Sequence, residues 1–258
     1  MPQSLHSAIY SSLDGKVVLV TGGASGIGEA LVEAFVAQKS RVLFCDVQDE
    51  VAQTLIERLR QPEYVPPQYF HCDLTNIEEL QQTLDRVLRS VPAIDVLVNN
   101  AGNDKRHNIE EVTPDFWDWC IQINLKHQFF MAQAVLPGMR KAKRGAIINM
   151  GSIAWMIPST GVPVYATAKA AIVGLTRTLA HEVGGEGIRV NCVLPGAIFT
   201  ERQRRLWLTD DYKKEILNRQ ALKTEIQPAD VAKLVLFLAS DESLAITNQS
   251  FVIDAGWV

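Results

Sequence analysis

The chain has 258 residues, of which 47% are hydrophobic and 21% charged, values that are ordinary for a globular protein with a substantial core. A formal net charge of −4 gives no electrostatic reason to expect nucleic acid or an anionic membrane as a partner. The longest uncharged stretch, residues 145–168, is interrupted by Asn149, Pro158 and Pro163 and is a poor membrane span.

Apolar runs and helical patterns alternate along the chain. The runs predict strands at 16–22, 41–47, 68–73, 94–100, 145–152, 188–196 and 249–254. The helical patterns lie around 26–39, 50–60, 76–90, 115–142, 163–183, 201–219 and 228–239. Strands that are apolar on both faces and separated by helices indicate a parallel sheet covered on both sides. Because no repeat or linker divides the chain, we predict one doubly wound α/β domain over residues 1–258.

The four cysteines are far apart and lack the spacing of metal ligands. They are Cys45, Cys72, Cys120 and Cys192. Three of them adjoin apolar strand-like runs, so we expect buried, reduced thiols and no metal site. Together with the absence of a secretory signal in the sequence, this favours a cytoplasmic protein.

A glycine-rich turn, TGGASGIGEA at 21–30, joins the first predicted strand to the first helix. Gly22, Gly26 and Gly28 permit a tight turn and a close approach of the backbone to a diphosphate, while the helix start supplies N–H donors. In doubly wound sheets ligands bind beyond the carboxyl ends of the strands, where the strand order reverses. The position of this turn therefore predicts a dinucleotide site.

Polar residues follow the next strands at the same edge. Asp46 can accept hydrogen bonds from both adenosine ribose hydroxyls and repel a 2′-phosphate, or it can be a plain turn residue; the neutral Ser25 and Val47 favour NAD over NADP. Asp73 either bonds the adenine amine or caps the following helix. NNAG at 99–102 offers polar side chains and a close-approach glycine, although a simple turn uses the same residues.

The segment VPVYATAKAA at 162–171 places Tyr165 and Lys169 one helical turn apart on the same face. A cation beside a phenol favours the phenolate and lowers the pKa of the phenol, which makes a base that works near neutral pH. A core tyrosine followed by a snorkelling lysine explains the same spacing, and on these two residues alone it is the better explanation.

Taken in order, TGGASGIG, NNAG, Asn124, Ser152, YATAK and PGAIFT (195–200) resemble the short-chain dehydrogenase/reductase family over about residues 14–257. The resemblance implies a single Rossmann-type domain with a seven-stranded parallel sheet and helices on both faces, assembled as a homotetramer or dimer. It also implies that Tyr165 is the base, that Lys169 together with the positively charged nicotinamide ring makes its phenolate accessible, and that Lys169 holds the nicotinamide ribose. Ser152 then bonds the reacting oxygen, and Asn124 positions a relay water.

The same resemblance implies NAD as the cofactor and a mobile substrate lid over about 197–220. The expected cofactor contacts are Gly22, Ser25, Gly26, Ile27, Gly28, Asp46, Asp73, Leu74, Asn100, Ala101, Gly102, Tyr165, Lys169, Pro195, Gly196, Ile198 and Thr200. The arginines of the lid, Arg202, Arg204 and Arg205, are interpreted as the solvated face of a helix.

Within the family, NNAGNDKRH (99–107), GSIAW (151–155), GAIFTERQ (196–203) and DAGW (254–257) resemble the aldose 1-dehydrogenases of the D-xylose type. A sugar pocket needs paired donors and acceptors, and an aromatic ring such as Trp155 can stack on a pyranose. The expected substrate contacts are Asn103, Asp104, Arg106, Ser152, Trp155, Tyr165 and Gln203. The alternative is a loop of solvated charges in which Asp104 pairs with Arg106.

The resemblance thus predicts oxidation of the anomeric hydroxyl of an aldose, a pentose such as D-xylose or L-arabinose or else a hexose, to the aldonolactone. One alternative is a related enzyme of the same fold that acts on a 3-oxoacyl compound, a cyclic alcohol or a polyol. The other is a non-catalytic dinucleotide sensor, against which the intact set of Ser152, Tyr165 and Lys169 argues.

Overall fold

The structure is a computed structural model that describes residues 8–258. In this range seven parallel strands form one sheet, as predicted, and their order in the sheet is β3-β2-β1-β4-β5-β6-β7. The strands are β1 (Val17–Thr21), β2 (Arg41–Asp46), β3 (Gln68–His71), β4 (Val96–Asn99), β5 (Gly145–Met150), β6 (Ile188–Pro195) and β7 (Ser250–Ile253). The first seven residues, on which the expected absence of a secretory signal partly depends, lie outside the described residues.

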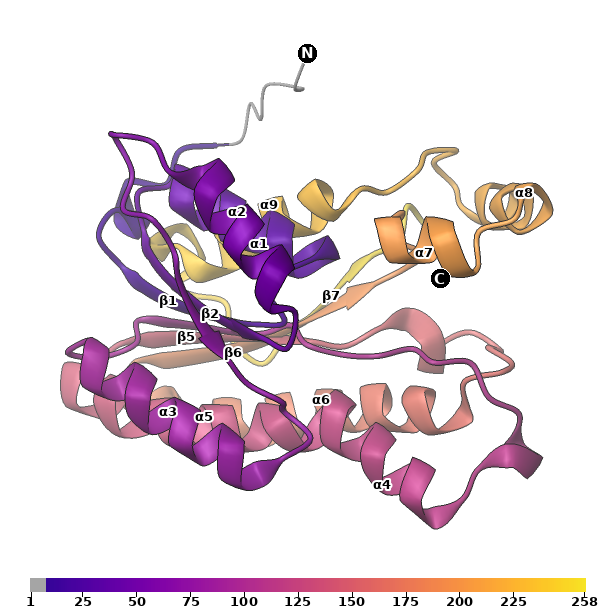
Figure 1. The fold of residues 1–258 in the computed structure, drawn as a ribbon, viewed down its shortest axis with the longest axis horizontal. Coiled ribbons are helices and arrows are strands. Elements are labelled where there is room, and N and C mark those ends of the chain that lie inside the picture. Colours follow the sequence, from indigo (N-terminus) through magenta and orange to yellow (C-terminus); the bar gives the residue numbers. More distant parts are fainter. Residues whose placement is uncertain (1–7) are drawn as a thin grey trace.

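Helices cover both faces of the sheet (Figure 1). One face packs against α1 (Gly26–Ala37), α2 (Asp49–Leu59) and α9 (Pro228–Ala239). The other packs against α3 (Ile77–Ser90), α5 (His127–Ala142) and α6 (Pro163–Val183). Alternate residues among positions 17–20 of β1 enter the two cores, which explains why all four are apolar.

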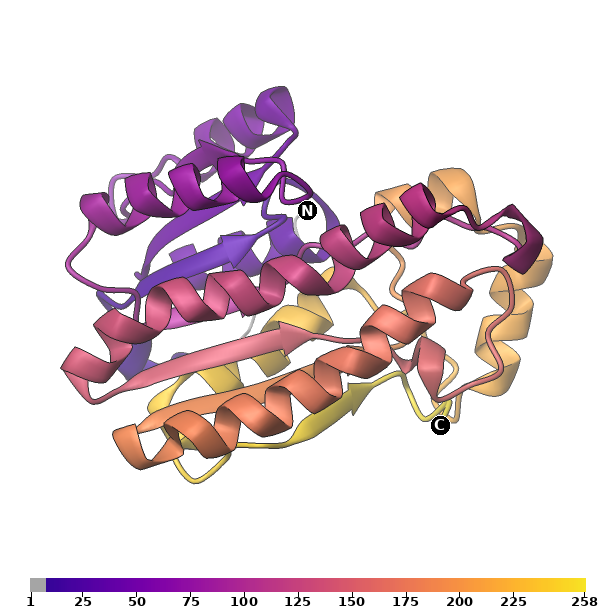
Figure 2. The same ribbon diagram turned by 90° about the horizontal axis from the view of Figure 1, so that it is seen from below.

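The strand order reverses at β1, which pairs with β2 on one side and with β4 on the other. In such a sheet the crevice for a ligand lies beyond the carboxyl ends of the strands at the reversal. Figure 2 shows the arrows of β5 and β7 pointing toward the end of the molecule where the orange segment with α7 (Glu201–Leu206) and α8 (Asp210–Arg219) lies. The lid region therefore adjoins the carboxyl edge.

Two predicted helices are interrupted. The helix expected over 115–142 consists of α4 (Pro114–Ile121), a π-helical segment (Gln122–Lys126) and α5. The helix expected over 201–219 is divided into α7 and α8, each begun by a threonine whose side chain accepts a backbone N–H, Thr200 and Thr209 respectively. A π-helical segment within a helix often marks a functional site.

All four cysteines are free and buried, as predicted. Burial raises the pKa of each thiol, which keeps the thiols protonated and unreactive. Among residues 8–258 no helix is both long and apolar enough to cross a membrane. Nor does this range contain a group of three or more His, Cys, Asp or Glu side chains arranged to hold a metal ion.

Candidate active site

A cavity of about 1070 Å³ opens at the carboxyl edge of the sheet. Residues that directly follow β1, β4, β5 and β6 line it, together with Asp46 at the end of β2. This volume lies at the upper end of the range of small-molecule sites, roughly 300–1,000 Å³. Every residue expected to contact the cofactor lines this cavity.

The glycine-rich turn provides a cradle that only glycine permits at two points. Gly22 has a φ of +64°, and a Cβ on Gly28 would lie 1.7 Å from the carbonyl oxygen of Gly22. The Ser25 side chain makes no capping hydrogen bond, so the first amides of α1 are available as donors beside the cavity. This arrangement fits the diphosphate of a dinucleotide, because an anion at a helix start is bound by N–H groups and by the helix dipole.

Asp46 lies at the end of β2 with its carboxylate held in place by the backbone. Oδ2 accepts a hydrogen bond from Ala24 N at 3.0 Å, and Oδ1 accepts one from Val47 N at 2.8 Å and one from Gln48 N at 3.1 Å. The residue is 8% exposed and borders the cavity. The carboxylate is therefore pre-oriented where a ribose would lie.

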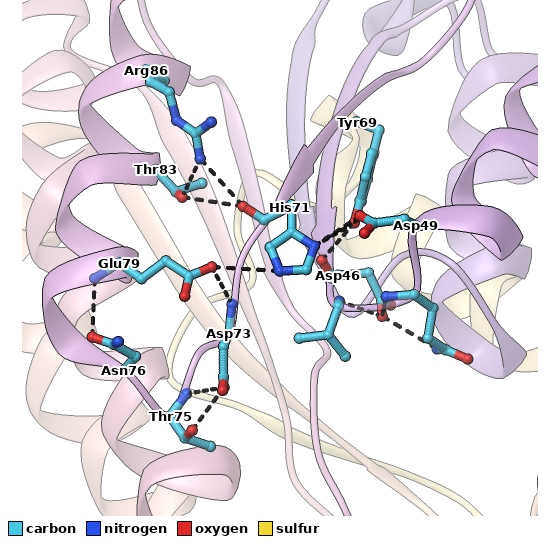
Figure 3. A network of polar contacts seen from close by, with 12 residues as sticks. Asp46, Asp49, Tyr69, His71, Asp73, Thr75, Asn76, Glu79, Thr83 and Arg86 are labelled. Carbon is cyan, nitrogen blue, oxygen red and sulfur yellow. Dashed lines mark hydrogen bonds and ion pairs between the residues drawn. The ribbon is translucent and has the colours of Figure 1, made fainter.

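Asp73 does not cap the following helix. Its Oδ1 accepts hydrogen bonds from the backbone N and the hydroxyl of Thr75, whereas the cap of α3 is Asn76, which accepts from Glu78 N and Glu79 N (Figure 3). The capping interpretation of Asp73 is therefore wrong, and its role toward adenine stays a prediction.

A polar network that the sequence analysis missed joins the ends of β2 and β3 (Figure 3). His71 Nδ1 lies 2.8 Å from Asp49 Oδ1, and Tyr69 Oη donates to the same oxygen at 2.6 Å. On the other side, His71 Nε2 lies 3.7 Å from Glu79 Oε1, which accepts from Asp73 N at 2.9 Å. Hydrogen bonds from Tyr69 and His71 lower the pKa of Asp49. The network ties the Asp73 loop to the strand that ends in Asp46.

Helix α6 carries Tyr165 and Lys169 to the far end of the cavity. The Lys169 Nζ lies 5.6 Å from the centroid of the Tyr165 ring and donates to Met150 O at 2.9 Å. Ser152 follows β5 directly, and its Oγ accepts from Ala154 N at 3.1 Å. The structure thus brings together three of the four residues expected to be catalytic.

Asn124, the fourth of these residues, lies in the π-helical segment and is fully buried. Its Nδ2 donates to Cys120 O and to Asn103 O, both at 3.0 Å, and its Oδ1 accepts from Asn103 N at 2.9 Å. A Cβ on Gly102 would lie 3.1 Å from Asn124 Oδ1 and 3.2 Å from Lys169 Nζ, so both groups border the same glycine. Asn124 therefore fixes the loop after β4 beside Lys169.

The electrostatics of Tyr165 differ from the expectation. Burial raises the pKa of Tyr165, Asp104 raises it further, and the Ser152 hydroxyl and Arg106 lower it by less. Burial also lowers the pKa of Lys169, to about 8. The expected low pKa of Tyr165 beside Lys169 is therefore wrong for the protein by itself, because desolvation outweighs the attraction of nearby cations.

The polar loop after β4 contacts the lid rather than solvent. Asp104 forms an ion pair with Arg202 of α7, and its Oδ2 accepts a hydrogen bond from Gln203 Nε2 at 2.6 Å. Arg106 instead lies over the ring of Trp207, with the guanidinium carbon 5.6 Å from the ring centroid. The alternative in which Asp104 pairs with Arg106 is therefore wrong, and so is the interpretation of Arg202 as part of a solvated helix face.

Trp155, the aromatic residue expected to stack on a sugar, does not line the cavity. Trp155 is 41% exposed and is not among the cavity-lining residues, whereas Trp119 and Trp257 are. Trp257 lies within the DAGW motif that supported the resemblance, but Trp119, on α4, carried no sequence signal. The other six expected substrate contacts line the cavity.

Nearly the full chain is similar to known dehydrogenases and reductases. The family model described as enoyl-(acyl carrier protein) reductase matches residues 22–258. D-xylose 1-dehydrogenase of Caulobacter vibrioides is 47% identical over 253 residues, covering 98% of this chain and 100% of that protein. A probable galactose dehydrogenase of Rhizobium meliloti is 44% identical, covering 98% and 99%. A 3-oxoacyl-[acyl-carrier protein] reductase from Brucella melitensis, solved with bound NAD, superposes with a TM-score of 0.88 at 32% identity, covering 100% of this chain and 96% of that chain.

Proposed function

This chain belongs to the short-chain dehydrogenase/reductase family, and we propose that it is an NAD-dependent dehydrogenase that oxidises the anomeric hydroxyl of an aldose to the aldonolactone. The observation that carries the proposal is one cavity that is lined both by the glycine-rich turn and by Ser152, Tyr165 and the polar residues of the loop after β4. The identity of 44–47% with a xylose and a galactose dehydrogenase supports the aldose as the substrate class.

In this proposal the cavity would hold the dinucleotide, whose nicotinamide would supply the acceptor for the hydride that leaves the anomeric carbon. The phenolate of Tyr165 takes the proton of the anomeric hydroxyl, while Ser152 donates a hydrogen bond to the same oxygen and orients it. Lys169, anchored on Met150 O, supplies a positive charge beside Tyr165. Asn124 holds the loop that borders Lys169.

A rate screen tests the substrate class. Aldopyranoses such as D-xylose, L-arabinose and D-galactose should be oxidised faster than xylitol or cyclohexanol, because only they present an anomeric hydroxyl among further hydroxyls. Deoxy sugars should lose about tenfold or more in kcat/KM for each lost contact, since a buried polar group without its partner costs about 1–3 kcal/mol. The product should appear first as a lactone, with acid released only on hydrolysis.

The aldose proposal fails if no aldose is oxidised while cyclohexanol is, or while a 3-oxoacyl thioester is reduced. Membership of the family stands in either case.

The coenzyme preference rests on Asp46. The kcat/KM with NAD should exceed that with NADP. Asp46→Asn should lower the ratio of kcat/KM for NAD to kcat/KM for NADP by about tenfold or more, because a carboxylate beside the 2′-phosphate of NADP costs several kcal/mol. Asparagine keeps the Oδ1 acceptor that Val47 N and Gln48 N use but loses the Oδ2 acceptor of Ala24 N, so the readout is the ratio of kcat/KM for the two coenzymes rather than either value alone. Asp49→Asn, which removes a nearby acid bonded to Tyr69 and His71, is the matched control. A wild-type preference for NADP would contradict the assignment.

Assembly and location complete the proposal. Trp117 on α4 and Phe129 on α5 are 43% and 44% exposed, and such aromatic residues suit an interface between copies of the chain. We therefore propose a homotetramer or dimer, to be checked by sedimentation.

Four buried thiols without a disulfide support a cytoplasmic location. We retain a single domain over 1–258 with a lid at about 197–220.

A further inference from the structure

Helix α7 of the lid is tied to the loop after β4 by a set of charged and amide contacts. Arg202 forms the ion pair with Asp104 and also donates from Nη2 to Asn103 Oδ1 at 3.0 Å. Gln203 Nε2 donates to the second oxygen of Asp104 at 2.6 Å. The partners are 98 or 99 residues apart in the chain, so the contacts join two separate walls of the cavity.

We propose that Arg202 is a positioning residue, which holds the Asp104 carboxylate in the pocket and offsets its charge beside Tyr165. The inference rests on the proposed function, because it concerns how that same site handles its substrate hydroxyl and its base. In this inference Asp104 accepts a hydrogen bond from a sugar hydroxyl, and Arg202 orients the Asp104 carboxylate.

The hydrogen-bonding capacity of Asp104 supports the substrate side of the inference. An ionised carboxylate has about four acceptor positions on its two oxygens. Arg202 occupies a position on one oxygen, and Gln203 occupies a position on the other. Each oxygen therefore keeps a position for a hydroxyl. Arginine suits this task better than lysine because its planar guanidinium contacts Asp104 and Asn103 with two different nitrogens.

The charged groups around Tyr165 support the proposal that Arg202 offsets the charge of Asp104. Five titratable or charged groups lie near the Tyr165 hydroxyl. The loop after β4 provides Asp104 and Arg106, and α4 and α6 provide Cys120 and Lys169 respectively. The fifth, Arg202 on α7, acts through its ion pair with Asp104. Asp104 is the acid among them, and it raises the pKa of Tyr165. A guanidinium paired with that acid weakens its effect at Tyr165, because opposite charges in contact largely cancel at longer range.

Two substitutions should therefore act in opposite directions on the pH profile of kcat/KM. Arg202→Gln leaves Asp104 without its ion-pair partner, so the rise of kcat/KM with pH should move to higher pH. At neutral pH, kcat/KM should fall about tenfold or more. Asp104→Asn removes the acid, so the rise should move to lower pH while KM for the sugar increases. In the double variant the profile should follow that of Asp104→Asn, because Arg202 then has no carboxylate to offset.

Arg204→Gln is the matched control, since Arg204 lies on the same helix but pairs with Glu225. Its profile should coincide with that of the wild type. The positioning role is overturned if Arg202→Gln and Asp104→Asn shift the profile in the same direction, or if neither shifts it, while the wild type still oxidises aldoses. If the substrate screen identifies another alcohol instead, the same profiles are measured with that alcohol. A wild-type protein that oxidises no alcohol overturns this inference together with the proposed function.

Discussion

Replacing Tyr165 by phenylalanine is expected to lower kcat by at least about a hundredfold, the usual effect of losing a general base. The ring is partly buried in the wall of the cavity, and phenylalanine keeps it there while removing only the hydroxyl. Binding of NAD should be nearly unchanged, because the substitution leaves the glycine-rich turn and Asp46, which provide other expected cofactor contacts, intact. Steady-state kinetics and a fluorescence titration with the cofactor measure the two quantities separately.

The pH dependence provides a second readout for Tyr165. Burial and Asp104 raise the pKa of this phenol, so the phenolate is scarce at neutral pH and wild-type kcat/KM should increase as the pH rises. The phenylalanine variant should lose this increase. Tyr64→Phe removes a hydroxyl outside the cavity and should preserve both rate and profile. Near-normal turnover in the Tyr165 variant would mean that another group is the base.

The strands and the catalytic helix could be predicted because their signals are local. Residues 17–20 are apolar at every position, since both faces of β1 are buried, and the predicted bounds of α6 coincide with Pro163–Val183. Proline at the first position of that helix and glycine directly after it are the usual residues at these points. The order of strands and glycine turns then placed the candidate site at the carboxyl edge.

The errors concern quantities that depend on tertiary structure. Asp104 has a guanidinium two residues away, but its partner is Arg202, and no local pattern indicates a pair 98 residues apart. The π-helical segment that holds Asn124 has an ordinary helical sequence. The pKa of Tyr165 depends on how much water reaches the phenol, which spacing along a helix does not reveal. For the same reason, the sequence did not reveal that Trp119 rather than Trp155 lines the cavity.

Burial of the Lys169 ammonium is expected to lower the free energy of unfolding of the protein. The side chain is 3% exposed, and burial lowers its pKa from 10.5 to about 8. At pH 7 the ammonium is still mostly charged, and a pKa difference of this size corresponds to about 3 kcal/mol. Lys169→Met, which keeps an unbranched chain of similar length, should therefore raise the free energy of unfolding at pH 7 by about 1–3 kcal/mol. Met150 O would keep the Nε2 donor of Gln128, at 3.4 Å.

The same variant should lose at least about a hundredfold in kcat, because the positive charge beside Tyr165 is removed. The sign of the pH effect follows from the lowered pKa. Between about pH 8 and pH 10.5 the unfolded wild type binds more protons than the folded protein, so its stability rises with pH in this window. The stability difference between variant and wild type should thus shrink from about pH 7 to about pH 9.5, in urea unfolding at one protein concentration. Lys141→Met, at an exposed position of α5, should show no such change. A variant that is less stable than the wild type at pH 7, or a difference that does not vary with pH, would show that burial of Lys169 carries no such cost.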